Sequence, residues 1–256
     1  MQKFDLVIPC KQLDYVKLPF VVSAAFNNLI GLRNIHIIAQ DPENINLTYI
    51  PYRNRVILHC DDHVLPYDRN QLQYRPSWIF QQYLKLLQDV TTTDWYLATD
   101  SDIIVNKKMP MWDADSKPIM YVANGGDVNA DYFEFNRHML GDKFAIPPEF
   151  SLITECMFYN KQLVQAMLDY CGFTRDQFWD RTVELSKQGI YPAETILYGN
   201  YILKQHPGVY STRYLLSSLG GKYGEHMWTQ KEIAEELAMK RVRNPDAHLI
   251  SIHSWQ

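Results

Sequence analysis

Short, solidly apolar runs separated by helix-length stretches fill the first half of the sequence. Such runs are typical of strands that are buried on both faces, because a strand with one solvated face alternates apolar and polar residues. Alternation of strands with helices indicates a parallel sheet with helices on both faces. We therefore predict an α/β fold. The predicted strands are Phe4–Ile8, Ile35–Ala39, Val56–Leu58, Trp95–Thr99 and Ile119–Ala123, and the predicted helices are Lys17–Leu29 and Trp78–Val90.

The second half of the sequence is richer in helix signals. Thr174 with Gln177, and Thr229 with Glu232, have the spacing of capping boxes, and Gly172 suits the end of a helix. With no internal repeat and no clear linker, one domain spanning residues 1–256 is the simplest organisation. The predicted helices are Leu163–Tyr170, a helix from Thr174 to near Gly189, Glu194–Gln205 and a helix after Thr229. The last predicted strand is His248–Ile252, and Asn124–Glu149 is predicted to be a long, partly irregular connection.

Composition and charge exclude several classes of partner. The formal net charge is −4, so we expect no nucleic-acid partner and no general attraction to anionic membranes. No apolar run approaches the length of a membrane span, and we read no signal peptide at the N-terminus. The four cysteines are far apart in the sequence and show no metal-binding or redox spacing. We therefore expect reduced thiols in a cytoplasmic protein.

The strongest chemical signal is a pair of carboxylates, Asp100 and Asp102, directly after the predicted strand Trp95–Thr99. Residues two apart in an extended chain point to the same side, so the two side chains converge. Oxygen ligands of this kind suit Mg²⁺ or Mn²⁺, and open α/β sheets bind ligands beyond the carboxyl ends of their strands. The alternative is a turn or helix-cap role. A second Asp-x-Asp match at Asp113 and Asp115 follows no strand and is interpreted as a solvated loop.

The order of the motifs along the chain resembles a known family. The set resembles nucleotide-sugar glycosyltransferases of the GT-A fold, and more closely a group of bacterial and viral proteins predicted to be glycosyltransferases. The order also parallels glycogenin-like enzymes. The resemblance extends from Phe4 to His253 and implies a GT-A, Rossmann-like, mostly parallel sheet with flanking helices. The segments that carry it are Arg75–Leu86, Asp100–Asp102, Glu155–Asn160 and Glu194–Tyr201.

The resemblance also implies roles for particular residues. GT-A enzymes often add a histidine near the end of the domain to the metal site, and His253 is the candidate here, ahead of His226 and His248. An ordinary surface histidine is the alternative. The donor would be a UDP- or GDP-sugar and the cofactor Mn²⁺ or Mg²⁺. The residues implied to contact the donor at the ends of the first strand and the metal strand are Pro9, Lys11 and Ser101.

Several further side chains are candidates from their positions. Trp78, Gln82 and Lys85 share one polar helix face that leads into the metal strand, and Arg75 before them suits a phosphate. A solvated helix face is the alternative.

Two carboxylates are candidates for the acceptor side. Glu194, in the first turn of a helix, is predicted to be the general base, although the helix dipole alone also explains a carboxylate there. Glu155 is predicted to bind the acceptor and is the second candidate base.

Together these features predict a metal-dependent glycosyltransferase. It would transfer a sugar from a nucleoside-diphosphate donor to a hydroxyl acceptor, with a glycan as the expected acceptor and with inversion at the anomeric carbon. The alternative from another class is a non-catalytic nucleotide- or glycan-binding module of the same fold. A sugar-phosphate nucleotidyltransferase is disfavoured, because that class has a Gly-rich basic loop where this chain has Pro9–Gln12.

Overall fold

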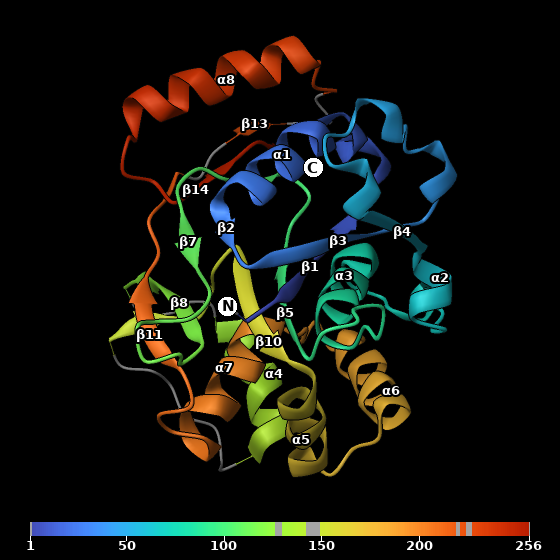
Figure 1. The fold of residues 1–256 in the computed structure, drawn as a ribbon. Coiled ribbons are helices and arrows are strands. Elements are labelled where there is room, and N and C mark those ends of the chain that lie inside the picture. The colour runs from blue at the N-terminus through green and yellow to red at the C-terminus, as the bar shows by residue number, and fades with distance from the viewer. Residues whose placement is uncertain (1, 126–129, 142–148, 219–220, 224–226, 256) are drawn as a thin grey trace.

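The computed structural model describes residues 2–125, 130–141, 149–218, 221–223 and 227–255 (Figure 1). A five-stranded sheet lies at its centre, in the spatial order β10 (Cys156–Asn160), β5 (Trp95–Thr99), β1 (Phe4–Cys10), β3 (Leu32–Ala39) and β4 (Val56–Cys60). β1 pairs in parallel with β3 and β5, and β3 pairs in parallel with β4. β10 runs antiparallel to β5. The fold is therefore α/β with a mixed sheet and flanking helices, which is compatible with a Rossmann-like arrangement.

Helices cover both faces of this sheet. Figure 1 shows α1 on one side, and α3, α5 and α7 on the other, while α8 lies beyond α1 and farther from the sheet. The inner strands are buried on both faces, as every residue of β1 illustrates, which explains their continuous apolar character, whereas the edge strand β4 is largely not buried. The helices are α1 (Leu18–Asn28), α2 (Asp61–Val64), α3 (Pro76–Leu86), α4 (Ala130–Leu140), α5 (Lys161–Cys171), α6 (Arg175–Ser186), α7 (Glu194–Gln205) and α8 (Gln230–Arg243).

Smaller sheets lie beside the central one. In the first, β8 (Ile119–Asn124) pairs with β11 (Ser211–Tyr214) and β9 (Phe150–Ser151). In the second, β14 (Leu249–Ser251) lies between β12 (Ser217–Ser218) and β6 (Ile103–Val105). Two-stranded pairs join β2 (Leu29–Ile30) to β7 (Met109–Pro110), and β13 (Gly221–Tyr223) to β15 (His253–Trp255).

Four of the five strands predicted from the first half belong to the central sheet, which confirms them. The fifth, predicted at Ile119–Ala123, does form a strand, but it pairs outside that sheet. The capping boxes at Thr174 and Thr229 are confirmed, and so is the left-handed Gly172, with a φ of 77°, at the end of α5. The last predicted strand corresponds to β14.

The prediction for residues 124–149 was wrong in part, because α4 lies within this segment. Its side chains Phe135 and Met139 are buried one turn apart, so an apolar helix face packs into the core. The Gly-Gly and Pro-Pro pairs that suggested an irregular connection flank the helix rather than interrupt it. Residues 126–129 and 142–148 of the predicted connection lie outside the described residues.

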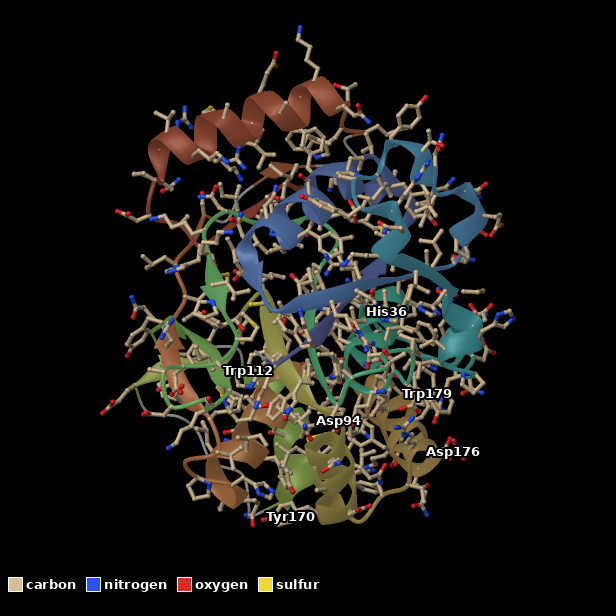
Figure 2. All side chains as sticks on the ribbon, viewed as in Figure 1. His36, Asp94, Trp112, Tyr170, Asp176 and Trp179 are labelled. Carbon is tan, nitrogen blue, oxygen red and sulfur yellow. The ribbon has the colours of Figure 1, made fainter. Side chains whose placement is uncertain are left out.

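A chain of polar side chains connects β1, β3 and β4 in the central sheet. His36 on β3, labelled in Figure 2, has Nδ1 3.0 Å from Nε2 of His59 on β4 and Nε2 3.4 Å from Oδ2 of Asp5 on β1. Arg33 donates two hydrogen bonds to the Asp5 carboxylate. Burial, followed by the neighbouring His36, lowers the pKa of His59 to about 4. This polar chain therefore favours a neutral His59 in the folded state.

The helices that the structure describes include none that is both long enough and apolar enough to cross a membrane. The four cysteines, all of them within the described residues, are free thiols, as their spacing predicted.

Candidate functional site

Asp100 lies directly after β5, where the chain turns towards β6. Its Oδ1 is 2.7 Å from Nζ of Lys85 and accepts a hydrogen bond of 2.9 Å from Nε2 of Gln81. Gln81 and Lys85 come from α3 and are one helical turn apart, so a single helix face contacts the carboxylate. A third of the Asp100 side chain, 34 %, is exposed. One carboxylate oxygen is therefore held by α3 while the side chain remains open to solvent.

Asp102 meets His253 across 151 residues of sequence, with Nδ1 of His253 2.7 Å from Oδ2 of Asp102. Pairing of β14 with β6, and a hydrogen bond from the Ile252 amide to the Asp102 carbonyl, bring the two side chains together. Oδ1 of Asp102 is buried and has no hydrogen-bond partner among the described residues. A buried carboxylate oxygen without a partner is costly, so this atom is suited to a ligand.

The charge of Asp102 is maintained despite its burial. Burial alone raises the pKa of this carboxyl, but the hydrogen bond and charge of His253 and the charges of Lys17 and Lys11 outweigh it, so the pKa is lowered. Lys11, predicted to contact the donor, is exposed at the end of β1 and lies within electrostatic reach of Asp102. Pro9 instead lies buried within β1 and is paired with Ile38. Lys11 is thus placed at the site, and Pro9 supports it from within the sheet.

Ser101, between the two aspartates, anchors the turn at residues 100–102 to the buried residue Asp14. Its hydroxyl donates a hydrogen bond of 2.7 Å to Oδ2 of Asp14, and Oδ1 of Asp14 is 2.6 Å from Nζ of Lys17. Both Asp14 and Lys17 are buried in the 3-10 helix Gln12–Lys17, which follows β1. Ser101 was predicted to contact the donor, but its side chain is buried and directed to Asp14. The hydroxyl therefore fixes the turn that carries Asp100 and Asp102.

Lys85 links Asp100 to Glu194, the first residue of α7. Its Nζ is 3.4 Å from Oε1 of Glu194, and both side chains are buried. Burial alone lowers the pKa of Lys85, but the charges of Asp100 and Glu194 raise it above its ordinary value, so the lysine stays protonated. Burial raises the pKa of Glu194, with a lesser opposing effect from Lys85. The structure thus places both predicted residues in one buried ion-pair network behind Asp100.

The rest of the predicted α3 face is only partly directed towards this network. Gln82 is buried, and its Nε2 donates to the Trp78 carbonyl of the same helix. Sequence reasoning chose Gln82 and missed Gln81, although the four-residue spacing from Gln81 to Lys85 signals that these two share a face. The predicted polar face is therefore neither solvated nor continuous.

Arg75 and Trp78 lie at the beginning of α3. Arg75 is exposed, and its guanidinium stacks 4.6 Å from the centre of the Trp78 ring. Its φ of 43° is left-handed, which is uncommon for a residue other than glycine. Trp78 also packs against Tyr132 and Tyr191, with ring centres 5.9 and 5.5 Å away. Arg75 therefore stacks on one side of an aromatic cluster formed by Trp78, Tyr132 and Tyr191, at the beginning of the helix that contacts Asp100.

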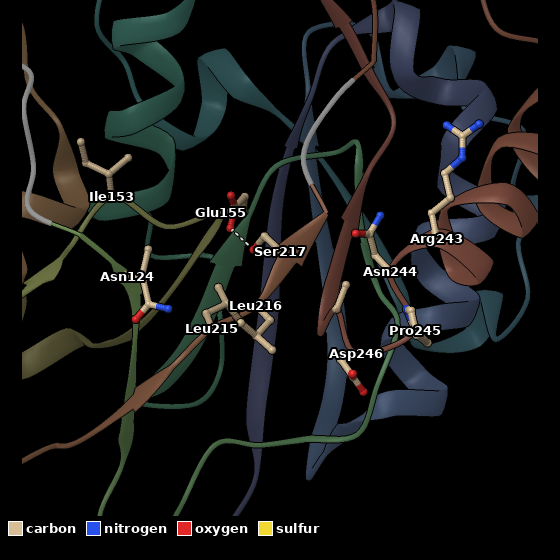
Figure 3. A pocket seen from close by; sticks show the side chains of 12 residues that line it. Asn124, Ile153, Glu155, Leu215, Leu216, Ser217, Arg243, Asn244, Pro245 and Asp246 are labelled. Atoms are coloured by element: carbon tan, nitrogen blue, oxygen red, sulfur yellow. Dashed lines mark hydrogen bonds between the residues drawn. The ribbon is translucent and has the colours of Figure 1, made fainter.

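Glu155 directly precedes β10 and lies beside the end of β5. Its carbonyl accepts a hydrogen bond of 2.8 Å from Thr99, and its Oε2 accepts one of 2.7 Å from Ser217 (Figure 3). The side chain is partly exposed and lines an open cavity of about 540 Å³. Glu155 is therefore accessible from a cavity, whereas Glu194 is enclosed.

A divalent cation fits the donor set in part. No three His, Cys, Asp or Glu side chains in the described ranges form a ready-made metal cluster. Mg²⁺ and similar ions, however, commonly take only one or two carboxylates and complete their coordination with water and substrate phosphates. Asp102 supplies a buried oxygen without a described partner, and Asp100 supplies an exposed carboxylate. Asp102, with His253 beside it, therefore supplies part of that lesser requirement, while Asp100 is held by Lys85 and Gln81.

Five of the predicted residues form two contact groups, one of Lys85, Asp100 and Glu194 and the other of Asp102 and His253, and the turn at residues 100–102 joins the two groups along the chain. Comparison with known proteins adds no family to this geometry, since no protein-family model matches the chain and no curated protein sequence matches it significantly.

Proposed function

We propose that the chain is a metal-dependent glycosyltransferase that moves a sugar from a nucleoside-diphosphate donor to a hydroxyl acceptor, with a glycan as the expected acceptor. The observation that carries the proposal is the contact between Asp102 and His253 at the carboxyl end of a parallel strand. That edge of an open α/β sheet is where ligands bind. The contact brings a histidine and a carboxylate that are 151 residues apart in the sequence to this edge of the sheet.

In this proposal Asp100, Asp102 and His253 hold Mn²⁺ or Mg²⁺ together with the diphosphate of a UDP- or GDP-sugar. The bound cation would neutralise charge that develops on the leaving diphosphate. Lys85 keeps Asp100 in place through its contact of 2.7 Å. Lys11 and Arg75, both exposed, are available to diphosphate oxygens. The chain's own residues thereby bind and orient the donor.

Two carboxylates compete for the role of general base. We retain Glu194 as the proposed base of an inverting transfer, because burial raises its pKa and so increases its proton affinity. Its side chain is only 6 % exposed, however, so the acceptor would have to enter beside Lys85. Glu155 is open to a cavity and is the alternative base. Glu194→Gln and Glu155→Gln distinguish them when the acceptor is saturating, since only the variant of the base then loses transfer while donor binding persists.

The test is release of nucleoside diphosphate from a panel of UDP- and GDP-sugars in Mn²⁺. Turnover should require Mn²⁺ and should fall by orders of magnitude in Asp102→Asn. The same variant should bind Mn²⁺ more weakly in the presence of UDP or GDP, which electron paramagnetic resonance measures without turnover. Asp115→Asn is the matched control, because Asp115 belongs to the second Asp-x-Asp match and is exposed in a loop.

Full turnover in chelator would refute the metal dependence. Nucleotide and Mn²⁺ binding without turnover on any donor would instead favour the non-catalytic binding module. Asp100 is already paired with Lys85, and this pairing is the observation that keeps that second function in view.

A further inference from the structure

The cavity beside Glu155 is built from four separate parts of the chain. It lies between the end of β8, the segment before β10, the segment that leads into β12, and the end of α8 with its following turn (Figure 3). Its volume of about 540 Å³ is within the range of 300–1,000 Å³ that is usual for small-molecule sites. The lining residues are Ala123, Asn124, Ile153, Glu155, Leu215, Leu216, Ser217, and residues 243–247.

The lining combines hydrogen-bonding groups with exposed apolar surface. Glu155 and Asn124 present a carboxylate and an amide, while Ile153 and Leu216 are 39 % and 44 % exposed. A sugar ring has the same combination, with hydroxyl groups on its edge and C–H groups on its faces. The cavity therefore complements a carbohydrate better than it complements a purely apolar chain.

Its charges nearly balance. Arg243 and Glu155 both belong to the lining and have opposite charges, and Asp246 is paired with Lys107, whose Nζ is 2.9 Å from Oδ1 of Asp246. No concentration of positive charge favours a phosphate or a nucleotide here, and no concentration of negative charge favours a basic peptide. The balance indicates a neutral ligand.

The cavity is also connected to the aspartate pair from two sides. Glu155 is bonded through its carbonyl to Thr99, the residue before Asp100. Ser217, which donates to Glu155, begins β12, and β12 pairs with β14, the strand before His253. A ligand in the cavity therefore lies next to the elements that carry the proposed metal site.

We propose that this cavity binds the acceptor, a neutral saccharide, and that Glu155 accepts a hydrogen bond from one of its hydroxyl groups. This inference rests on the proposed transferase function for its meaning, but the saccharide-binding site can be tested without turnover. Glu155 fixes one edge of the sugar, and the exposed faces of Ile153 and Leu216 pack against its C–H surface.

The experiment uses saturation-transfer NMR with three neutral disaccharides, lactose, maltose and cellobiose, on the full chain. At least one should receive saturation from the wild-type protein. Glu155→Gln, which preserves size, should weaken its binding about tenfold or more, because a hydrogen bond to a charged group is lost. Leu216→Asp should also weaken it, since the mutation removes exposed apolar surface. Glu43→Gln, an exposed glutamate outside the cavity, is the control. Melting curves establish that each variant is folded.

Two results would overturn the inference. One is that none of the three disaccharides binds, and the other is that Glu155→Gln and Leu216→Asp bind as the wild type does. The transferase proposal fails separately. Saccharide binding that depends on Glu155, without turnover of any nucleotide sugar, supports the cavity and refutes the transferase. Donor turnover together with unaltered saccharide binding in the variants supports the transferase and refutes the saccharide site in the cavity.

Discussion

Replacing Lys85 with methionine tests the buried network that supports Asp100. Nζ of Lys85 is 2.7 Å from Asp100 and 3.4 Å from Glu194, and the Glu194 side chain is 6 % exposed. Lys85→Met leaves Glu194 buried without its cation, a change that typically costs about 3–5 kcal/mol. For a chain of this size, 1 kcal/mol shifts the melting temperature by about 2–4 °C. We therefore expect melting about 6–20 °C lower at pH 7.

The matched control is Lys231→Met, which removes an exposed helix lysine 3.8 Å from Glu235 and should cost about 0–1 kcal/mol. Adding Glu194→Gln to Lys85→Met should restore much of the loss, because the unpaired charge is then gone.

The pH dependence of the stability loss in Lys85→Met has a defined sign. A carboxyl whose folded pKa is raised favours folding at low pH and loses that advantage as pH rises, so Lys85→Met should be less harmful at pH 5 than at pH 7. Urea unfolding curves measure all of these differences. Equal costs for the two lysine variants, or no rescue by Glu194→Gln, would refute the network.

Two further predictions concern the fold. Lowering the pH from 7 to 5 should cost about 1 kcal/mol through His59, allowing for solvent screening of this half-buried ring, because the unfolded histidine, with a pKa near 6.5, binds a proton before the folded one, with a pKa of about 4. His59→Gln should reduce this acid sensitivity in urea unfolding curves, and an unchanged slope would contradict the assignment. Gly199→Ala should cost about 1–3 kcal/mol, because the new Cβ would lie 2.7 Å from Cδ2 of Leu152. Leu152→Val should recover part of that loss in thermal melts, whereas additive losses would show that the two positions do not clash.

β1, β3 and β5 could be predicted because burial on both faces produces a continuous apolar run in the sequence. The direction in which a strand runs within the sheet has no comparable signal in the sequence. β10 is as fully buried as β1, yet it runs antiparallel to β5. The position of β8 outside the central sheet is likewise decided by tertiary pairing with β11 and β9. Local pattern therefore predicted four of the five central strands and not β10, and packing decided which sheet each strand joins.

The residues of the candidate site also divide into those that a local sequence pattern indicates and those that only the tertiary structure reveals. Asp100 and Asp102 could be identified because two carboxylates after a buried strand are a local pattern, whereas the choice of His253 depended on a family resemblance. Periodicity on α3 selected Lys85 correctly but could not decide between Gln81 and Gln82, which are adjacent and chemically identical. The role of Asp14 in holding Ser101 had no local signal, because the two residues are 87 positions apart.

The distance of 151 residues between Asp102 and His253 also has a consequence for biosynthesis. At a translation rate of about 5–20 residues per second, His253 is made roughly 8–30 s after Asp102. A nascent chain can complete β1, β3 and β5 during that interval, but the histidine that contacts Asp102 does not yet exist. If the two residues share one metal site, a ribosome-bound chain can present the aspartate pair without the histidine that completes the site, and translation itself delays metal binding.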